Sequence, residues 1–214
     1  MPLWIWKRKG VYKIFGSYHT KDILYTLTKH YYTMLRKNGP WIIKKTIPKY
    51  KNLWIDVKED QVIRPDGKPG IFGVVDMKAG VSVLPIDENG FVYLTDEFHY
   101  AIEQDSIEVV SGGIDNNEKP LDAAKRELQE ELGIIAKEWT ELGLVNPYTA
   151  VIRSPAHLFL ARKIEFTKSN QEGTETIKLV KIKFEDAVKM VMESKITHGP
   201  SCVLILKAKE FLKK

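Results

Sequence analysis

The segment from Gly112 to Ile134 constrains the fold more than any other feature, because it predicts one helix with two chemically opposite faces. Pro120 suits the first turn of a helix, where its missing N–H costs little, and Gly133 is typical of the position just after a helix end. Between them, apolar residues recur at spacings of three and four: Leu121, Ala124, Leu128 and Leu132. We expect a helix over 120–132 that packs this face on a sheet.

The other face of this helix carries three carboxylates. Glu127, Glu130 and Glu131 are spaced i, i+3 and i+4, so they share one side of the helix and repel one another. Such a cluster is either a solvated acidic surface or a site for divalent cations. Carboxylate oxygens are hard ligands, which suit Mg²⁺ or Mn²⁺ better than zinc. We expect the helix to hold these acids outward, toward solvent.

The complete segment favours the cation site, because it resembles the Nudix box, G-x5-E-x7-R-E-U-x-E-E-x-G-U, in which U is aliphatic. Every fixed position is filled: Gly112, Glu118, Arg126, Glu127, Leu128, Glu130, Glu131, Gly133 and Ile134. A chance match has a probability on the order of 10⁻¹⁰ per starting position at ordinary residue frequencies. The resemblance implies a Nudix hydrolase. Enzymes of this family split a nucleoside diphosphate linked to another moiety with magnesium or manganese and water, on an α/β/α sandwich around a mixed sheet.

The resemblance also implies roles for single residues. Arg126 matches the arginine that orients the catalytic Glu127, and Glu118 supports Arg126. Gly112 and Gly133 match the structural glycines of the box. The metal ligands that it implies, for two or more ions, are Glu127, Glu130, Glu131 and the backbone carbonyl of Ser111.

Short strands surround the box without strict βαβ alternation. We expect strands at 41–47, 53–57, 61–64, 71–76, 81–85, 91–95, 107–110, 142–145, 156–161 and 176–184, and closing helices at 185–193 and 201–212. Turns are predicted at 65–67 and 87–90. This order favours the α/β class, with a mixed sheet covered by helices on both faces, in agreement with the resemblance.

The flanking sequence resembles ADP-ribose pyrophosphatases over about residues 41–212. The stretch 64–67 and the strands on either side of it resemble their leading strands, and Pro147 lies 14 residues beyond Gly133, near a proline associated with ADP-ribose hydrolysis. The implied substrate is ADP-ribose or another nucleotide sugar, and the implied products are AMP and a sugar phosphate. The alternatives are a broader dinucleotide or coenzyme pyrophosphatase and a nucleotide-sensing module that does not cleave.

Departures from this branch gather around the expected substrate site. His99 stands where relatives have a substrate-binding arginine, Glu108 lies in the segment that enters the box, and Tyr148 replaces a glycine after Pro147. We predict substrate contacts at these four positions. Tyr148 and Phe98 have two uses, stacking on a base or packing in the core, and core packing is the simpler expectation.

An acidic loop at 169–177 supplies the candidate general base. Glu175 fits the acidic position that relatives have in this loop, and Glu172 is the alternative. The resemblance implies that one of them is the base or an additional metal ligand. The simpler alternative is that both are solvated loop acids.

Basic residues cluster ahead of this domain. Residues 1–40 contain eight Lys and Arg residues and one acid, Asp22, so they carry +7, whereas the whole chain carries +5. Apolar residues at helical spacing predict a helix over 21–37, with Thr20 as its cap: Ile23, Leu24, Leu27, Tyr31, Met34 and Leu35. We therefore divide the chain into a basic extension with one helix, 1–40, and a Nudix domain, 41–214.

The charge of the extension suits RNA or an anionic membrane surface, but it contains no nucleic-acid motif, so a solvated appendage or a dimerisation arm is the simpler expectation. We expect a homodimer, by resemblance and because the aromatic face of this helix needs a surface to pack on; strands in 41–77 are a second candidate contributor. Cys202 is the only cysteine, which excludes an intramolecular disulfide. We expect a cytoplasmic protein, since no apolar run approaches about 20 residues and the start does not resemble a signal peptide.

Overall fold

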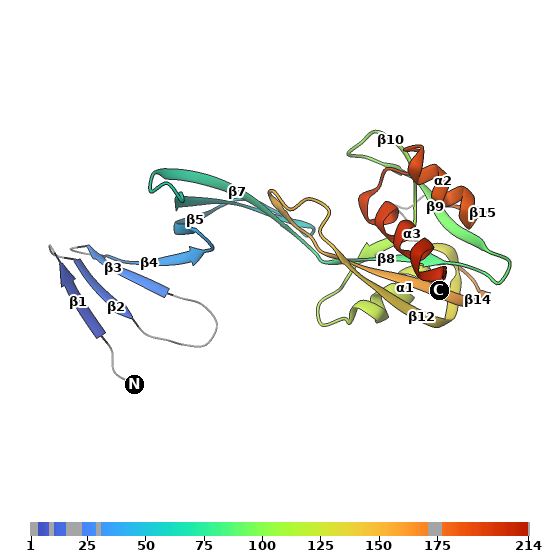
Figure 1. Ribbon diagram of the computed structural model, residues 1–214, viewed down its shortest axis with the longest axis horizontal. Coiled ribbons are helices and arrows are strands. Elements are labelled where there is room, and N and C mark those ends of the chain that lie inside the picture. Colours follow the sequence, from blue (N-terminus) through green and yellow to red (C-terminus); the bar gives the residue numbers. More distant parts are fainter. Residues whose placement is uncertain (1–3, 9–10, 16–22, 29–30, 171–176, 214) are drawn as a thin grey trace. The chain divides into compact units, whose positions relative to one another are not determined.

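The computed structural model describes residues 4–8, 11–15, 23–28, 31–170 and 177–213, with side chains from residue 35 onward in these ranges. The chain divides into two compact units, Met1–Met77 and Lys78–Lys214 (Figure 1). The boundary predicted from the sequence lies after residue 40. In the structure the strands between 41 and 77 group instead with the strands that precede them. No helix in the described ranges is long and apolar enough to cross a membrane.

The first unit consists of antiparallel strands: β1 (Trp4–Arg8), β2 (Val11–Phe15), β3 (Ile23–Thr28), β4 (Tyr31–Asn38), β5 (Trp41–Lys51), β6 (Ile55–Ile63) and β7 (Pro69–Met77). Strands β3 to β7 pair in chain order, and β1 pairs with β2. The predicted strands 53–57 and 61–64 are parts of one strand, β6. The predicted turn at 65–67 is confirmed, with the N–H of Gly67 bonded to the carbonyl of Arg64 at 2.9 Å.

The helix predicted over 21–37 is wrong. Its described residues form the antiparallel pair β3 and β4, in which Tyr25 is opposite Met34 and Leu27 is opposite Tyr32. Isoleucine, threonine and tyrosine favour strands, and they outweigh an apolar spacing that also fits a helix. The predicted cap, Thr20, lies outside the described residues. Gly39, with φ +56°, turns the chain from β4 into β5 instead of ending a helix.

The second unit holds the box between two sheets and three helices. Its strands are β8 (Gly80–Pro85), β9 (Phe91–His99), β10 (Gln104–Glu108), β11 (Val110–Gly113), β12 (Ile134–Val145), β13 (Ile152–Arg153), β14 (Ala156–Phe166) and β15 (Lys178–Lys183). The helices are α1 (Pro120–Leu132), α2 (Phe184–Met192) and α3 (Gly199–Leu212), which confirms the predicted box helix and both closing helices. One sheet has the order β11-β8-β14-β12 and is mixed, since β14 runs parallel to β8; the other, β10-β9-β15, is antiparallel.

Successive side chains along the strands of the mixed sheet pack in two separate hydrophobic clusters. Val83 and Phe159 pack with Leu128 of α1, whereas Leu84 and Leu158 pack in a second cluster. The helical members of that second cluster include Phe184 and Val188 of α2 and Leu204, Ile205 and Ala208 of α3. Because neighbouring residues of a strand point to opposite faces, helices cover both faces of this sheet. The expected α/β/α arrangement is confirmed.

Candidate active site

Helix α1 is anchored at both ends and along one face. Pro120 occupies its first turn, and Gly133, with φ +62°, ends it by donating its N–H to the carbonyl of Gln129 at 3.0 Å. Ala124 and Leu128 are completely buried against the sheet. The backbone of α1 is therefore a rigid support for the polar side chains along its other side.

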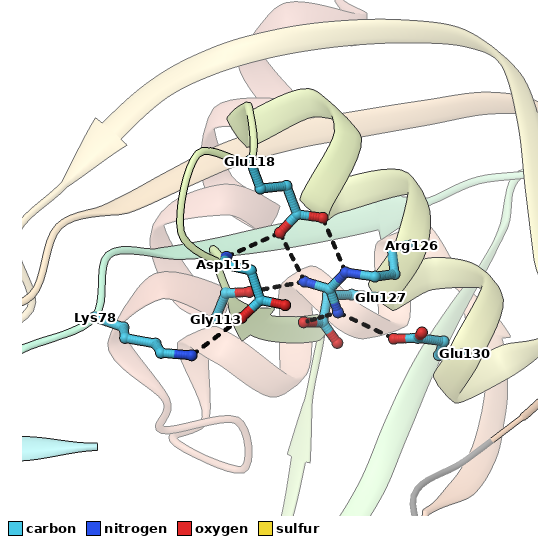
Figure 2. A network of polar contacts seen from close by, with 7 residues as sticks. All are labelled: Lys78, Gly113, Asp115, Glu118, Arg126, Glu127 and Glu130. Carbon is cyan, nitrogen blue, oxygen red and sulfur yellow. Dashed lines mark hydrogen bonds and ion pairs between the residues drawn. The ribbon is translucent and has the colours of Figure 1, made fainter. Parts of the chain in front are cut away.

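Arg126 is the centre of the polar network in Figure 2. Its Nε and Nη2 donate to the two carboxylate oxygens of Glu118 at 2.9 and 3.0 Å. Its Nη1 donates to Glu127 at 2.8 Å and to Glu130 at 3.0 Å, and Nη2 also donates to the carbonyl of Gly113 at 2.9 Å. One guanidinium thus joins the loop before α1, strand β11 and two glutamates of the helix.

The charges of this network reinforce one another. The hydrogen bonds that Arg126 donates to Glu118 raise the pKa of Arg126 above its ordinary value, against the opposing effect of burial, and Glu127 and Glu130 add to the increase. The hydrogen bond from Arg126, followed by the one from the N–H of Asp115, holds the pKa of Glu118 below its ordinary value. The arginine therefore stays protonated and the glutamate ionised at neutral pH.

The loop between β11 and α1 is held by two further contacts. The N–H of Asp115 donates to Glu118 at 2.9 Å, and Nζ of Lys78 donates to the carboxylate of Asp115 at 3.0 Å (Figure 2). Lys78 and Asp115 were not predicted as site residues, since neither occupies a fixed position of the box. Lys78 is 37 residues from its partner, so only the pairing of β8 with β11 brings them together.

Gly112 makes room for the carboxylate of Glu127. A Cβ atom on Gly112 would lie 2.0 Å from Cδ of Glu127 and 2.1 and 2.4 Å from its two oxygens. Only a residue without a side chain allows the glutamate to lie against strand β11. This explains the structural role predicted for Gly112: its backbone lies directly beside the carboxylate of Glu127.

The three acids of α1 differ in exposure. The side chains of Glu127 and Glu130 are 13% and 39% exposed, and Glu131 is only 6% exposed. The expectation that all three face solvent is therefore wrong. Glu131 follows the buried Ala124 by seven residues, which is about two helical turns, so it lies on the flank of the apolar stripe.

The donor set fits a hard divalent cation, although its side chains are not arranged as a preformed cage. Among the described residues, no group of three or more His, Cys, Asp or Glu side chains is placed to hold a metal ion. Glu127 and Glu130 nevertheless converge on the same nitrogen of Arg126, and every donor predicted for the site is oxygen. Ser111 adds a backbone carbonyl on β11; its hydroxyl lies 3.0 Å from that of Ser82. Oxygen ligands of this kind suit Mg²⁺ or Mn²⁺.

Four residues from separate elements meet just ahead of the box. Glu108, at the end of β10, contacts Nε2 of His99 from β9 and Nδ1 of His198, which precedes α3, each at 3.0 Å. Ser201 of α3 accepts the N–H of Val109 at 3.0 Å. The structure thus brings together the predicted residues His99 and Glu108. His198 and Ser201 were missed, because they are about 90 residues further along the chain and match no motif.

The remaining predicted substrate residues lie at the surface. Pro147 and Tyr148 follow β12 in an exposed turn, and Tyr148 is 55% exposed. Phe98 is 51% exposed, so core packing is the wrong expectation for both aromatic residues. Glu172 and Glu175 lie outside the described residues. The segment leading toward them is fixed to the end of α1, because Thr167 donates to the carbonyl of Gly133 at 2.6 Å and Asn170 to that of Glu130 at 2.9 Å.

Family profiles match both units of the chain. The NUDIX domain profile matches residues 76–196, and the profile of the nucleoside diphosphate sugar hydrolase N-terminal domain matches residues 45–75. The chain belongs to the Nudix hydrolase family. The junction of the two profiles lies beside the division between the compact units after Met77. The box residues around Arg126 are therefore those of a Nudix hydrolase, and most of the segment from β5 to β7 lies within the match to the N-terminal domain profile.

Relatives of this Nudix hydrolase include ADP-ribose pyrophosphatases. The chain is 28% identical to the ADP-ribose pyrophosphatase of Bacillus subtilis over 79% of this chain and 95% of the relative. It is 24% identical to the methanol dehydrogenase activator of Bacillus methanolicus over 74% of this chain and 88% of that protein. The crystal structure of an ADP compounds hydrolase matches with a TM-score of 0.71 at 17% identity, over 80% of this chain and 93% of the other, which shows a shared fold.

Proposed function

We propose that this Nudix hydrolase cleaves the pyrophosphate bond of ADP-ribose or another nucleotide sugar, and that it requires a divalent cation. The products are a nucleoside monophosphate, AMP from ADP-ribose, and a sugar phosphate. The observation that carries the proposal is the position of Glu127, which is held by Arg126 at 2.8 Å and lies against Gly112. The similarity to ADP-ribose pyrophosphatase along nearly its full length supports the substrate class.

The residues proposed to hold two or more Mg²⁺ or Mn²⁺ ions are Glu127, Glu130, Glu131 and the backbone carbonyl of Ser111. When bound, such ions neutralise the charge of the two phosphates and lower the pKa of coordinated water. Arg126 limits the rotamers of Glu127 through the hydrogen bond that its Nη1 donates. Gly112 leaves space for that carboxylate beside the backbone of β11.

A second acid is needed to accept the proton of the attacking water. We assign this role to Glu175, with Glu172 as the alternative, because residues 167–170 fix the start of their loop to the C-terminal end of α1. Replacement of each residue by Gln shows which of the two glutamates is the base, since only loss of the base lowers kcat strongly. Equal, wild-type kcat in both variants contradicts the assignment.

A substrate panel with Mg²⁺ tests the reaction. We expect the purified full chain to convert ADP-ribose to AMP and ribose phosphate, and to act more weakly on GDP-mannose, diadenosine polyphosphates and NADH. The panel is broad because relatives of this chain carry different names, including that of an activator protein. A preference for dinucleotides supports the broader pyrophosphatase, and the absence of turnover on every member supports a sensor.

Substitution of Glu127 tests the site. Glu127→Gln keeps the shape of the side chain but removes its charge, so we expect kcat to fall about 100-fold or more, as for loss of a charge that stabilises a transition state by several kcal/mol. Asp122→Asn removes the same charge from an exposed position of the same helix and is the matched control. Steady-state kinetics with ADP-ribose measure both. Comparable activity of the two variants contradicts the role of Glu127.

The cytoplasmic location expected from the sequence stays a prediction. Contact of residues 1–40 with RNA or a membrane surface is the less favoured alternative to a solvated appendage or a dimerisation arm. Salt-dependent RNA binding by the full chain and by a variant lacking residues 1–40 tests this contact. Unchanged binding on deletion contradicts it.

A further inference from the structure

Both oxygens of Glu108 are occupied by histidines. Oε1 lies 3.0 Å from Nε2 of His99, and Oε2 lies 3.0 Å from Nδ1 of His198. The carboxylate is only 12% exposed. Burial acts to raise the pKa of Glu108, but hydrogen bonds, first from His198 and then from Ser106, lower it below its ordinary value. Glu108 is thus an ionised acceptor with little surface left for a substrate.

The two rings are more accessible than the carboxylate between them. The side chain of His99 is 39% exposed and that of His198 is 28% exposed. Glu108 is four residues ahead of Gly112, a separation of at most about 14 Å along an extended chain. Ser201 ties the start of α3 to Val109, so His198 is fixed relative to the strand that enters the box. The histidine pair is therefore tied to the strand that enters the box.

The carboxylate determines which nitrogen of each ring carries the proton. An ionised carboxylate only accepts hydrogen bonds, so Nε2 of His99 and Nδ1 of His198 are the donors. Nδ1 of His198 also lies 2.8 Å from Oγ of Ser201, which accepts from the same N–H. In a neutral imidazole the other nitrogen is then an acceptor. The structure records no partner for Nδ1 of His99 or Nε2 of His198 among the residues that it describes. The three side chains are also not arranged to hold a metal ion.

We propose that His99 and His198 accept hydrogen bonds from hydroxyl groups of the substrate's sugar, and that Glu108 is a positioning residue that fixes both tautomers. This inference rests on the proposed hydrolysis of a nucleotide sugar. It replaces the predicted substrate contact of Glu108 and adds His198, from the C-terminal part of the chain, to the substrate site. The two histidines contact the sugar and not the phosphates. They therefore affect the affinity for the substrate and not the rate of the chemical step.

Two substitutions of His198 distinguish a direct contact with the substrate from a role in holding Glu108. Asn keeps an N–H near the position of Nδ1, and so a partner for Glu108, but lacks the outer acceptor; Ala lacks both. We expect each variant to raise KM for ADP-ribose about 3- to 10-fold, the effect of one hydrogen bond, with kcat within about twofold of wild type. His99→Gln, which keeps a donor near Nε2, has the same expected effect. Recovery of the wild-type KM in His198→Asn overturns the proposal, because a merely supporting residue is rescued by the retained donor.

Binding to full-length protein that carries Glu127→Gln tests the pair without turnover. Calorimetry with ADP-ribose and with analogues that each lack one ribose hydroxyl identifies the hydroxyl concerned. We expect one deletion to weaken binding when His198 is present and to have no effect in His198→Asn. Equal losses in both backgrounds, or no binding of any analogue, overturn the proposal. Failure of the wild type to hydrolyse ADP-ribose overturns the proposed function alone, since the hydroxyl dependence of binding is measured separately.

Discussion

At the scale of single residues, the site depends on how Arg126 distributes its donors. Glu118 receives two of them, and Glu127 and Glu130 share a third. Glu118 therefore fixes the plane of the guanidinium, and that plane sets where Nη1 meets Glu127. A change at Glu118 is expected to reach the carboxylate of Glu127 through Arg126.

The lowered pKa of Glu118 predicts a pH dependence of stability. Because its folded-state pKa lies below the unfolded value of 4.5, Glu118 stabilises the protein fully above that value and loses this contribution as the pH falls through the folded-state pKa. We expect Glu118→Gln to reduce the free energy of unfolding by about 1 kcal/mol at neutral pH. Urea unfolding at several pH values measures this difference. It is expected to be constant above about pH 5.5 and to shrink below 4.5, and a difference that persists unchanged in acid contradicts the assignment.

The contact between Gly112 and Glu127 predicts a loss of activity without a loss of fold. In Gly112→Ala the new methyl group displaces the carboxylate, which moves easily because it is the end of a flexible side chain. We expect kcat to fall about 100-fold, the effect of an ångström-scale misplacement, while the melting temperature stays near that of wild type. Gly113→Ala is the control, since its Cβ would meet only Cδ of Lys78 at 3.6 Å. Similar kinetics for both variants refute the argument.

At the scale of elements, the C-terminal end of α1 joins the box to the segment that leads into the acidic loop. A Cβ on Gly133 would lie 2.5 Å from the carbonyl oxygen of Thr167 and 2.7 Å from the backbone N of Ser169, and Gly133 has φ +62°. Backbone atoms cannot move aside as a side-chain end does. The close approach therefore fixes the distance between α1 and residues 167–169.

Substitution of Gly133 is expected to destabilise the fold through this contact. Gly133→Ala adds strain from the positive φ and a clash with backbone, and we expect a loss of about 2 kcal/mol or more in the free energy of unfolding. Gly90→Ala is the matched control, since Gly90 has φ +73° but nothing within 4 Å of its Cβ; we expect a loss of about 1 kcal/mol from strain alone. Denaturant unfolding compares them, and equal losses exclude the clash as a cause.

The elements differ in how well sequence predicts them. Helix α1 is predictable to the residue because its apolar stripe, Pro120 and Gly133 all indicate the same bounds. The segment 21–37 is not, since its apolar residues fit both periods and only β-propensity and strand pairing decide between them. Glu131 is also mispredicted, because position on the flank of a stripe leaves burial to the neighbouring strands. His198 meets Glu108 only through the fold, and no local pattern predicts that contact.

At the scale of the whole molecule, the first unit exposes apolar side chains near the turn between β5 and β6. Leu53 is 82% exposed, Trp54 68%, Tyr50 57% and Met77 42%. The turn is rigid, because the side chain of Asn52 accepts the N–H groups of Trp54 and Ile55, each at 2.8 Å. Rigid, exposed apolar groups of this kind favour association with another protein surface.

We therefore retain the homodimer as a prediction, with these residues as the contact in place of the helix expected at 21–37. The full chain is expected to sediment as a dimer at micromolar concentration. Leu53→Ser with Trp54→Ser is expected to shift it toward monomer, because the double substitution removes the two most exposed of these four apolar side chains. Ile135→Ser, at a 42% exposed position of β12 in the other unit, is the control and should remain dimeric. A wild-type monomer at this concentration refutes the prediction, and a dimer that survives the double substitution moves the contact elsewhere.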